Sequence, residues 1–102
     1  MGEFLKVASS TEVAEGDLAA FDVGGKRVAV ANVGGALHAF DDTCTHLQCS
    51  LAEGELEGTV VTCPCHGSQF DVTSGEVLRG PAQKPVLSYA ARVEDDALRV
   101  EI

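Results

Sequence analysis

The sequence contains no tryptophan and few other aromatic residues, with one tyrosine and four phenylalanines among 102 residues. Basic residues are also scarce, because 7 Lys and Arg stand against 16 Asp and Glu and leave a formal net charge of −9. Nucleic acids and anionic membranes are bound by Lys and Arg that neutralise phosphate, and unpaired bases stack on aromatic rings. Both shortages argue against a nucleic-acid or membrane partner. They favour either a basic protein partner or simple solubility.

Long apolar segments are missing as well. No run without a charged residue is longer than 13 residues, and one of that length, Val28–Phe40, includes Asn32, His38 and two glycines. A membrane-spanning helix needs about 20 mostly apolar residues. The start Met-Gly-Glu-Phe-Leu-Lys also lacks the basic region and apolar core of a signal peptide. We therefore expect a cytoplasmic protein without a membrane segment. Thiols are normally reduced there, so clustered Cys and His indicate a metal before a disulfide.

No long helix is predicted, because short runs of strand-forming residues alternate with turn residues along the chain. Gly24-Gly25 and Asp95-Asp96 each separate two such runs and indicate hairpins, with strands at 18–23, 27–33, 88–94 and 97–102. A single helical turn is expected near residues 10–14, after capping residues. Eight to ten short strands predict an all-β sandwich or barrel of antiparallel strands. A chain of 102 residues forms one domain with a modest core.

Two short loops, Cys44–Cys49 and Cys63–Ser68, hold all four cysteines and two of the three histidines. Each loop supplies one Cys and one His, as Cys44-x-His46 and Cys63-x-x-His66, with sixteen residues between His46 and Cys63. Such a set can bind one zinc ion, or a [2Fe–2S] cluster in which two histidines replace two cysteines on one iron. A mononuclear zinc finger usually has both cysteines before both histidines. That order is absent here, and the alternation favours a two-metal arrangement.

The pattern Cys-x-His, sixteen residues, Cys-x-x-His resembles the cluster motif of the Rieske family. Its neighbours Cys-His-Gly-Ser-Gln-Phe-Asp at 65–71, Ser-Gly-Glu at 74–76 and Gly-Pro-Ala at 80–82 also resemble that family. The resemblance covers roughly residues 26–102 and is densest over 42–82. It implies that residues 1–102 form a single Rieske domain. A cluster-binding subdomain of about 42–85 would then carry the two loops, on a base of about 1–41 and 86–102.

The resemblance implies that Cys44 and Cys63 bind one iron as thiolates, and that His46 and His66 bind the outer, more exposed iron. Two ferric ions, two sulfides and two thiolates sum to about zero charge, whereas four thiolates would bring the sum to about −2. An electron adds more easily to the neutral core. Rieske centres accordingly have potentials of roughly −150 to +300 mV, against about −400 mV for all-cysteine plant-type ferredoxins.

Residues beside the ligands are expected to tune this cluster. By the resemblance, Ser68 donates a hydrogen bond to a bridging sulfide, which stabilises the reduced form. Phe70 stands where high-potential members attached to cytochrome bc complexes carry a tyrosine donor, so we expect a potential in the lower half of the range.

The resemblance also implies a cover and a docking patch for the cluster. Gly80-Pro81-Ala82 resembles the family's proline loop, which covers the cluster. Leu47, Gln48, Pro81 and Gln83 are expected to surround the histidines as a small docking patch, and Gly67 belongs to the same surroundings.

Cys49 and Cys65 are left over, one in each loop. In bc-type Rieske proteins the matching cysteines form a disulfide, whereas ferredoxins of aromatic-ring dioxygenases often lack them. We expect a disulfide, and two buried thiols are the alternative that a reducing cytoplasm favours. His38 is expected to be a partly buried structural residue. The acidic residues Glu53, Glu55, Glu57, Asp95 and Asp96 are expected to form a solvated surface, and a share of them to dock a basic partner.

The family resemblance implies an electron carrier, a Rieske-type ferredoxin, and not an enzyme. It would pass single electrons from an NAD(P)H-dependent ferredoxin reductase to a terminal oxygenase, typically an aromatic-ring dioxygenase of aromatic hydrocarbon catabolism. Contacts with both would be transient and the carrier a monomer. An oxygenase would need a further iron held by two histidines and a carboxylate, and only His38 remains. A redox-sensing or assembly module and a soluble fragment of a respiratory Rieske subunit stay open as alternatives.

Overall fold

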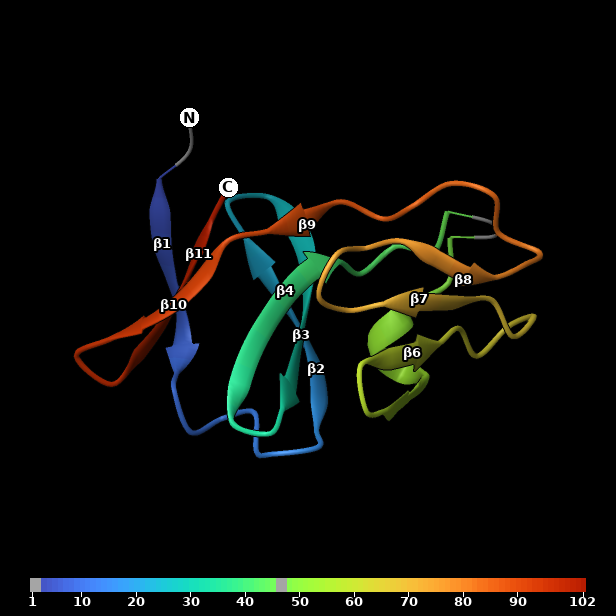
Figure 1. Cartoon of the computed structure of the whole chain (residues 1–102). Helices are drawn as coiled ribbons and strands as arrows, with labels where there is room; N and C mark the ends of the chain where they lie inside the picture. Colours follow the sequence, from blue (N-terminus) through green and yellow to red (C-terminus); the bar gives the residue numbers. More distant parts are fainter. Residues whose placement is uncertain (1–2, 46–47) are drawn as a thin grey trace.

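The computed structural model describes residues 3–45 and 48–102, which fold into three antiparallel sheets (Figure 1). The elements are β1 (Phe4–Ser9), β2 (Leu18–Val23), β3 (Lys26–Val33), β4 (Ala36–Asp41), the 3-10 helix η1 (Leu51–Glu53), β5 (Glu55–Glu57), β6 (Val60–Thr62), β7 (Gln69–Asp71), β8 (Val77–Arg79), β9 (Ser88–Tyr89), β10 (Ala91–Glu94) and β11 (Ala97–Glu101). The all-β prediction is confirmed. None of the described residues belongs to a helix that is long and apolar enough to cross a membrane.

Two of the sheets form the base of the molecule, with strand orders β1-β11-β10 and β2-β3-β4-β9. They enclose a core of aliphatic side chains, in which Val28 and Val30 of β3 meet Leu98 and Val100 of β11. All four side chains are fully buried. Burial of a Val or Leu side chain stabilises a fold by about 1.5–3 kcal/mol, so these pairs hold the two sheets together.

The central strand β3 is buried on both faces. Successive side chains of a strand point to opposite sides, and Val28 and Val30 enter the base core while Ala29 and Ala31 enter a second core. This explains why residues 28–31 are all apolar instead of alternating with polar residues. The second face carries the part of the molecule that contains the cysteine loops.

That part contains the third sheet, β5-β6-β7-β8, whose strands are each three residues long. Its core joins Phe40 of β4 to Leu51, Val61 and Phe70, together with Cys44 and Cys63. In Figure 1 this sheet lies beside the base, on the side away from the β10–β11 turn. The two halves of the molecule thus share one strand pair, β3 and β4, and bury a different core on each of its faces.

A buried carboxylate connects the two parts. Asp42 follows β4 and is 3% exposed. Its Oδ1 accepts a 2.8 Å hydrogen bond from the Ala52 amide of η1, and its carbonyl accepts a 2.7 Å bond from the Leu51 amide. Its other carboxylate oxygen lies 3.7 Å from the guanidinium of Arg27 in β3. A buried carboxylate requires such partners, so Asp42 fixes η1 against the base.

Three details differ from the sequence prediction. No helical turn forms at 10–14, because long-range bonds hold this segment: the Asn32 side chain donates to the Val13 carbonyl (2.8 Å) and the Gly16 amide donates to the Asn32 carbonyl (2.8 Å). The one helix among the described residues, η1, was not predicted. The predicted strand 88–94 is divided at Ala90, because β9 pairs with β4 whereas β10 pairs with β11 in the other sheet.

Candidate functional site

The two cysteine loops have the same hydrogen-bonded backbone frame. The Cys44 amide donates to the Cys49 carbonyl at 2.9 Å, and the Cys63 amide donates to the Ser68 carbonyl at 2.7 Å. Within these pairs, the amides of Gln48 and Gly67 donate back to the carbonyls of Cys44 and Cys63.

Gln48 and Gly67 also share a left-handed backbone, with φ of 59° and 79°. Glycine adopts that conformation readily, whereas glutamine is unusual there. Each loop therefore places its first cysteine at the same point of the same turn.

The first cysteines of the two loops lie buried beside one another. Cys44 is 0% and Cys63 is 3% exposed, and neither forms a disulfide. Burial raises the pKa of the Cys63 thiol, and the adjacent Cys44 thiol raises it further, while the backbone amides of Cys65 and His66 act in the opposite direction. Two neighbouring buried thiolates repel one another unless a cation lies between them. The donor set therefore fits a metal that accepts two thiolates.

The second cysteines, Cys49 and Cys65, form a disulfide with a Cα–Cα distance of 6.5 Å. The predicted disulfide is thus confirmed, and it ties the end of the first loop to the middle of the second. The sulfurs of Cys49, Cys63 and Cys65 lie within 4.8 Å of one another. Because two of these three are bonded to each other, they do not constitute a further metal site.

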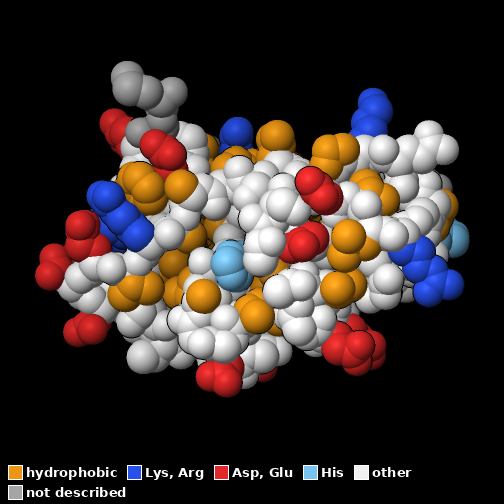
Figure 2. Space-filling view, in the orientation of Figure 1, with side chains coloured by type: hydrophobic (Ala, Val, Ile, Leu, Met, Phe, Trp, Pro, Cys, Tyr) orange, Lys and Arg blue, Asp and Glu red, His pale blue; other side chains and the backbone are white. Residues whose placement is uncertain are grey.

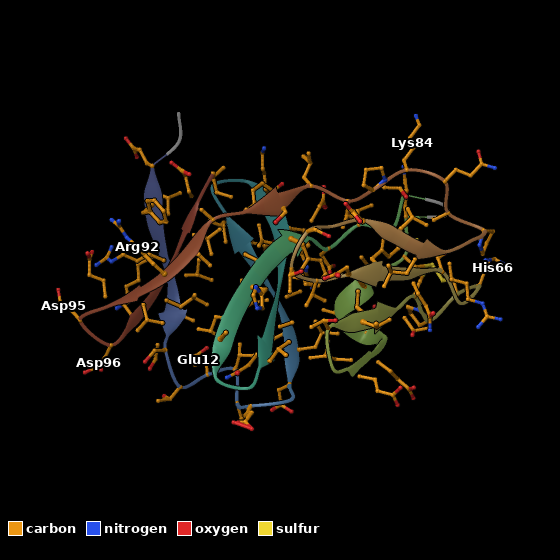
Figure 3. All side chains as sticks on the ribbon, in the orientation of Figure 1. Glu12, His66, Lys84, Arg92, Asp95 and Asp96 are labelled. Carbon is orange, nitrogen blue, oxygen red and sulfur yellow. A yellow bond between two sulfur atoms is a disulfide. The ribbon has the colours of Figure 1, made fainter. Side chains whose placement is uncertain are left out.

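His66 lies exposed at the surface end of the second loop, far from the β10–β11 turn with Asp95 and Asp96 (Figure 3). The structure therefore places three of the four predicted ligands, with two cysteines inside and one histidine outside. The predictions for His46 and Leu47 lie outside the described residues.

Ser68 and Phe70 are both buried, and both follow Cys63 closely in the chain. Ser68 is 1% exposed, and its Oγ accepts a 3.0 Å hydrogen bond from the Ala82 amide. Because the Ser68 oxygen is the acceptor in this bond, the Ser68 hydroxyl can still donate its proton to a second group. Phe70 is fully buried in the same core as Cys44 and Cys63, and its ring offers no hydroxyl group. Both observations suit the tuning roles that were predicted.

The segment 80–85 contacts both loops. The Ala82 amide donates a hydrogen bond to the Ser68 hydroxyl oxygen of the second loop. In the first loop, the Thr45 hydroxyl donates to the Lys84 carbonyl at 2.7 Å. The Gly80–Pro81 peptide bond is cis. A depression of about 480 Å³ beside the first loop is lined by Thr45, Pro81, Gln83 and Lys84. The sequence patterns did not indicate Thr45 or Lys84, because their contact joins residues 39 positions apart.

A second depression, of about 410 Å³, borders the second loop and is lined by Glu53, Gly54, Glu55, Thr62, Cys63, Pro64 and Gly67. The predicted docking residues Pro81 and Gln83 thus border the first depression, and Gly67 borders the second. Gln48 is exposed.

His38 on β4 is half-buried, as predicted for a structural histidine. Two hydrogen bonds from Thr73, through its hydroxyl and its amide, hold the pKa of the Asp71 carboxyl below its usual value, and the charge of His38 adds a smaller effect. His38 therefore interacts with the Asp71 carboxylate at the end of β7. It is not one of the four predicted ligands.

Comparison with known proteins identifies the family. The family model for the Rieske [2Fe-2S] domain matches residues 3–90. The ferredoxin component of biphenyl 2,3-dioxygenase from Rhodococcus jostii is 36% identical over 97 residues, which cover 95% of this chain and 91% of that protein. The cytochrome b6-f complex iron-sulfur subunit of Chlorobaculum thiosulfatiphilum is 37% identical over 94 residues, but only 51% of that subunit is covered.

Solved structures agree with this assignment. A chain in a complex of reduced oxygenase and oxidized ferredoxin in carbazole 1,9a-dioxygenase superimposes with a TM-score of 0.89 at 34% identity, covering 96% of this chain and 92% of that one. The family match over residues 3–90 includes both cysteine loops, the third sheet and the proline segment. The chain therefore belongs to the Rieske [2Fe-2S] domain family.

Proposed function

We propose that this protein is a ferredoxin that carries single electrons from an NAD(P)H-dependent reductase to a terminal oxygenase, one that hydroxylates aromatic rings. The observation that supports this most is the match over nearly the whole length of a dioxygenase ferredoxin component. The cytochrome b6-f complex iron-sulfur subunit is matched over only half its length, so a fragment of a respiratory Rieske subunit is the weaker alternative. The carrier role needs two transient protein contacts and no catalytic site of its own.

The cofactor of the family is a [2Fe–2S] cluster, which supplies one-electron oxidation and reduction when bound. We assign Cys44 and Cys63 to one iron and His46 and His66 to the other. The buried thiols hold the inner end of the site, and the exposed His66 gives an edge at the surface. Electrons would enter and leave at this edge, with Leu47, Gln48, Gly67, Pro81 and Gln83 around it.

Ser68 and Phe70 are proposed to set the potential. The Ser68 hydroxyl, already fixed by the Ala82 amide, would donate to a cluster sulfur and stabilise the added negative charge. Phe70 offers no second hydroxyl. We therefore expect a potential in the lower half of the range from roughly −150 to +300 mV. Potentiometry that gives a value close to the upper limit would contradict this assignment.

The remaining proposals concern the organisation of the molecule. We propose a single domain with a cluster-binding subdomain of about 42–85 on a base of about 1–41 and 86–102. The protein is proposed to be a cytoplasmic monomer. An elution volume in size-exclusion chromatography that corresponds to a dimer, at micromolar concentration, would contradict the monomer.

Two experiments test the function. Absorption and EPR spectra of the purified protein distinguish a histidine-ligated [2Fe–2S] cluster from zinc and from an all-cysteine cluster. Reconstitution with a reductase and a ring-hydroxylating oxygenase should then give NAD(P)H-dependent product formation that requires this protein. Tight binding to a regulator without turnover would favour the redox-sensing alternative. Because ions screen the attraction between charged docking surfaces, we expect turnover to slow as salt rises.

A further inference from the structure

The two depressions that border the cysteine loops carry opposite charge. The depression beside the first loop contains Lys84, and the depression beside the second loop contains Glu53 and Glu55. Both depressions lie at the histidine end of the molecule, where Figure 3 labels Lys84 and His66. In the third sheet Glu55 is the register partner of Thr62, which precedes the second loop, and Arg79 is the register partner of Gln69, which follows it. The loop that carries His66 is therefore flanked by an acidic residue on β5 and a basic residue on β8.

The neighbouring segments extend this polarity. Residues 77–86 contain two cations, Arg79 and Lys84, and no acidic residue. Residues 51–58 contain three glutamates and no basic residue. Arg79 ends β8 and is the register partner of Gln69, which directly follows the second loop. Figure 2 shows Lys and Arg atoms near the pale-blue histidine at the right-hand end, and acidic atoms at the lower edge of the same half. We name residues 77–86 the cationic flank and residues 51–58 the anionic flank.

Local charges decide what approaches this end. The Debye length is about 8 Å at physiological ionic strength, so exposed charges on the far side of the base are largely screened there. The protein measures 39 Å along its longest axis. The net charge of −9 therefore describes the whole molecule, but an approaching group at the histidine edge interacts mainly with the two flanks.

We propose that the cationic flank is a docking contact for a redox partner, and that it receives carboxylate side chains of that partner in the depression at Lys84. Thr45 holds the backbone carbonyl of Lys84, which leaves the side chain to project from a fixed position. The anionic flank repels the same carboxylates, so the pair of flanks orients the partner across the histidine edge. This inference rests on the proposed electron-carrier function and adds to it the charge and orientation of one partner.

The first test uses small inorganic oxidants and does not depend on the partner. The reduced holoprotein gives one electron to hexacyanoferrate(III), which becomes hexacyanoferrate(II), and stopped-flow absorbance follows the rate. At about 0.15 M ionic strength Lys84→Glu should slow this anionic oxidant roughly 3- to 5-fold. The matched control Lys6→Glu, on exposed β1 surface, produces the same net charge, since exchanging +1 for −1 changes −9 to −11. It should change the rate less than about 1.5-fold.

The anionic flank is tested in the mirror experiment. With the cationic oxidant tris(phenanthroline)cobalt(III), Glu55→Lys should slow the reaction, whereas Glu12→Lys at the opposite end (Figure 3) should not. The absorption spectrum of each variant verifies that the cluster is intact. Equal rates with hexacyanoferrate(III) for Lys84→Glu and Lys6→Glu would contradict the proposal that the two flanks act on an approaching ion by their local charge.

The second test uses the protein partners. Lys84→Glu should raise the apparent KM for the reductase or for the oxygenase several-fold, and Lys6→Glu should leave both unchanged. If Lys84→Glu affects hexacyanoferrate(III) but neither protein, the docking role is overturned even though the polarity holds. Failure of the proposed function would look different, because the wild type would then transfer no electrons to the oxygenase while the inorganic rates stayed the same.

Discussion

The base and the cluster-binding part of this protein are stabilised in different ways. In the base, β1 to β4 are six to eight residues long and enclose a core of Val and Leu. In the other part, β5 to β8 have three residues each, and all four cysteines and all three prolines lie in or beside its loops. Long paired strands suffice for the base, whereas short strands that hold open loops need cross-links. The following predictions test this division.

The largest effect is expected at the buried thiols. Cys63→Ser should abolish the cluster, because a thiolate ligand of the inner iron is lost, and iron content and the visible spectrum measure this. Its matched control is Cys65→Ser, two positions along the same loop, which breaks only the disulfide. Since no cysteine belongs to the base, the far-ultraviolet circular dichroism of Cys63→Ser should still report β-sheet. Loss of that signal would show that the base depends on the metal.

Removal of the disulfide should be the second largest change. Cys49 and Cys65 are 16 residues apart, and closing a loop of that size stabilises a protein by about 3 kcal/mol. The double variant Cys49→Ser/Cys65→Ser should lose this amount in urea unfolding of the cluster-free protein. Hydrogen exchange should localise the loss to β5–β8. Equal loss of protection in β1–β4 would refute the division.

Asp42 connects the two parts, and Asp42→Ala should cost about 2 kcal/mol. The variant leaves the Ala52 amide without its acceptor. The ion pair with Arg27 contributes less, because Arg27 is 54% exposed and solvent screens the pair. Arg27→Gln should therefore cost below about 1 kcal/mol. Asp22→Asn, which alters the exposed acid on the other side of Arg27, should have no measurable effect on the urea midpoint.

Ser68→Ala should lower the reduction potential by roughly 50 mV, which corresponds to the loss of one hydrogen bond of about 1 kcal/mol for a one-electron couple. Ser50→Ala is its control, because the buried Ser50 hydroxyl has no hydrogen-bond partner among the described residues. Protein-film voltammetry measures both variants. An unchanged potential in Ser68→Ala would contradict a hydrogen bond from the Ser68 hydroxyl to the cluster.

The smallest effect concerns pH. The hydrogen bonds from Thr73 lower the pKa of Asp71 in the folded protein, so their contribution is present above the unfolded pKa, about 3.9. It is lost as pH falls through the lower folded pKa. Thr73→Val removes the hydroxyl donor and should destabilise the protein at pH 7 more than at pH 2.5. Thermal unfolding at both pH values measures this effect. An equal loss of stability at both would contradict linkage to the Asp71 carboxylate.

The sequence predicted the ligand residues of the site better than the contacts that surround them. Cys44, Cys63 and His66 could be singled out because metal ligands need particular residue types at particular spacings. The disulfide of Cys49 and Cys65 followed from the family resemblance. The contact of Thr45 with Lys84 could not be predicted, since it joins distant residues of ordinary type. Local signals also misled at residues 10–14, where the Asn32 side chain outweighs the capping residues.

The amino-acid sequence by itself determined the all-β class, the hairpins at Gly24-Gly25 and Asp95-Asp96, and the ligand types in the two loops. These properties depend on local backbone preference and on side-chain chemistry, which the order of residues states directly. Only the tertiary structure decided that β3 separates two cores, that Asp42 joins the two parts, and that Lys84 and Glu55 line separate depressions beside the two cysteine loops. Those arrangements arise when distant segments pack, because burial and charge act through space and not along the chain.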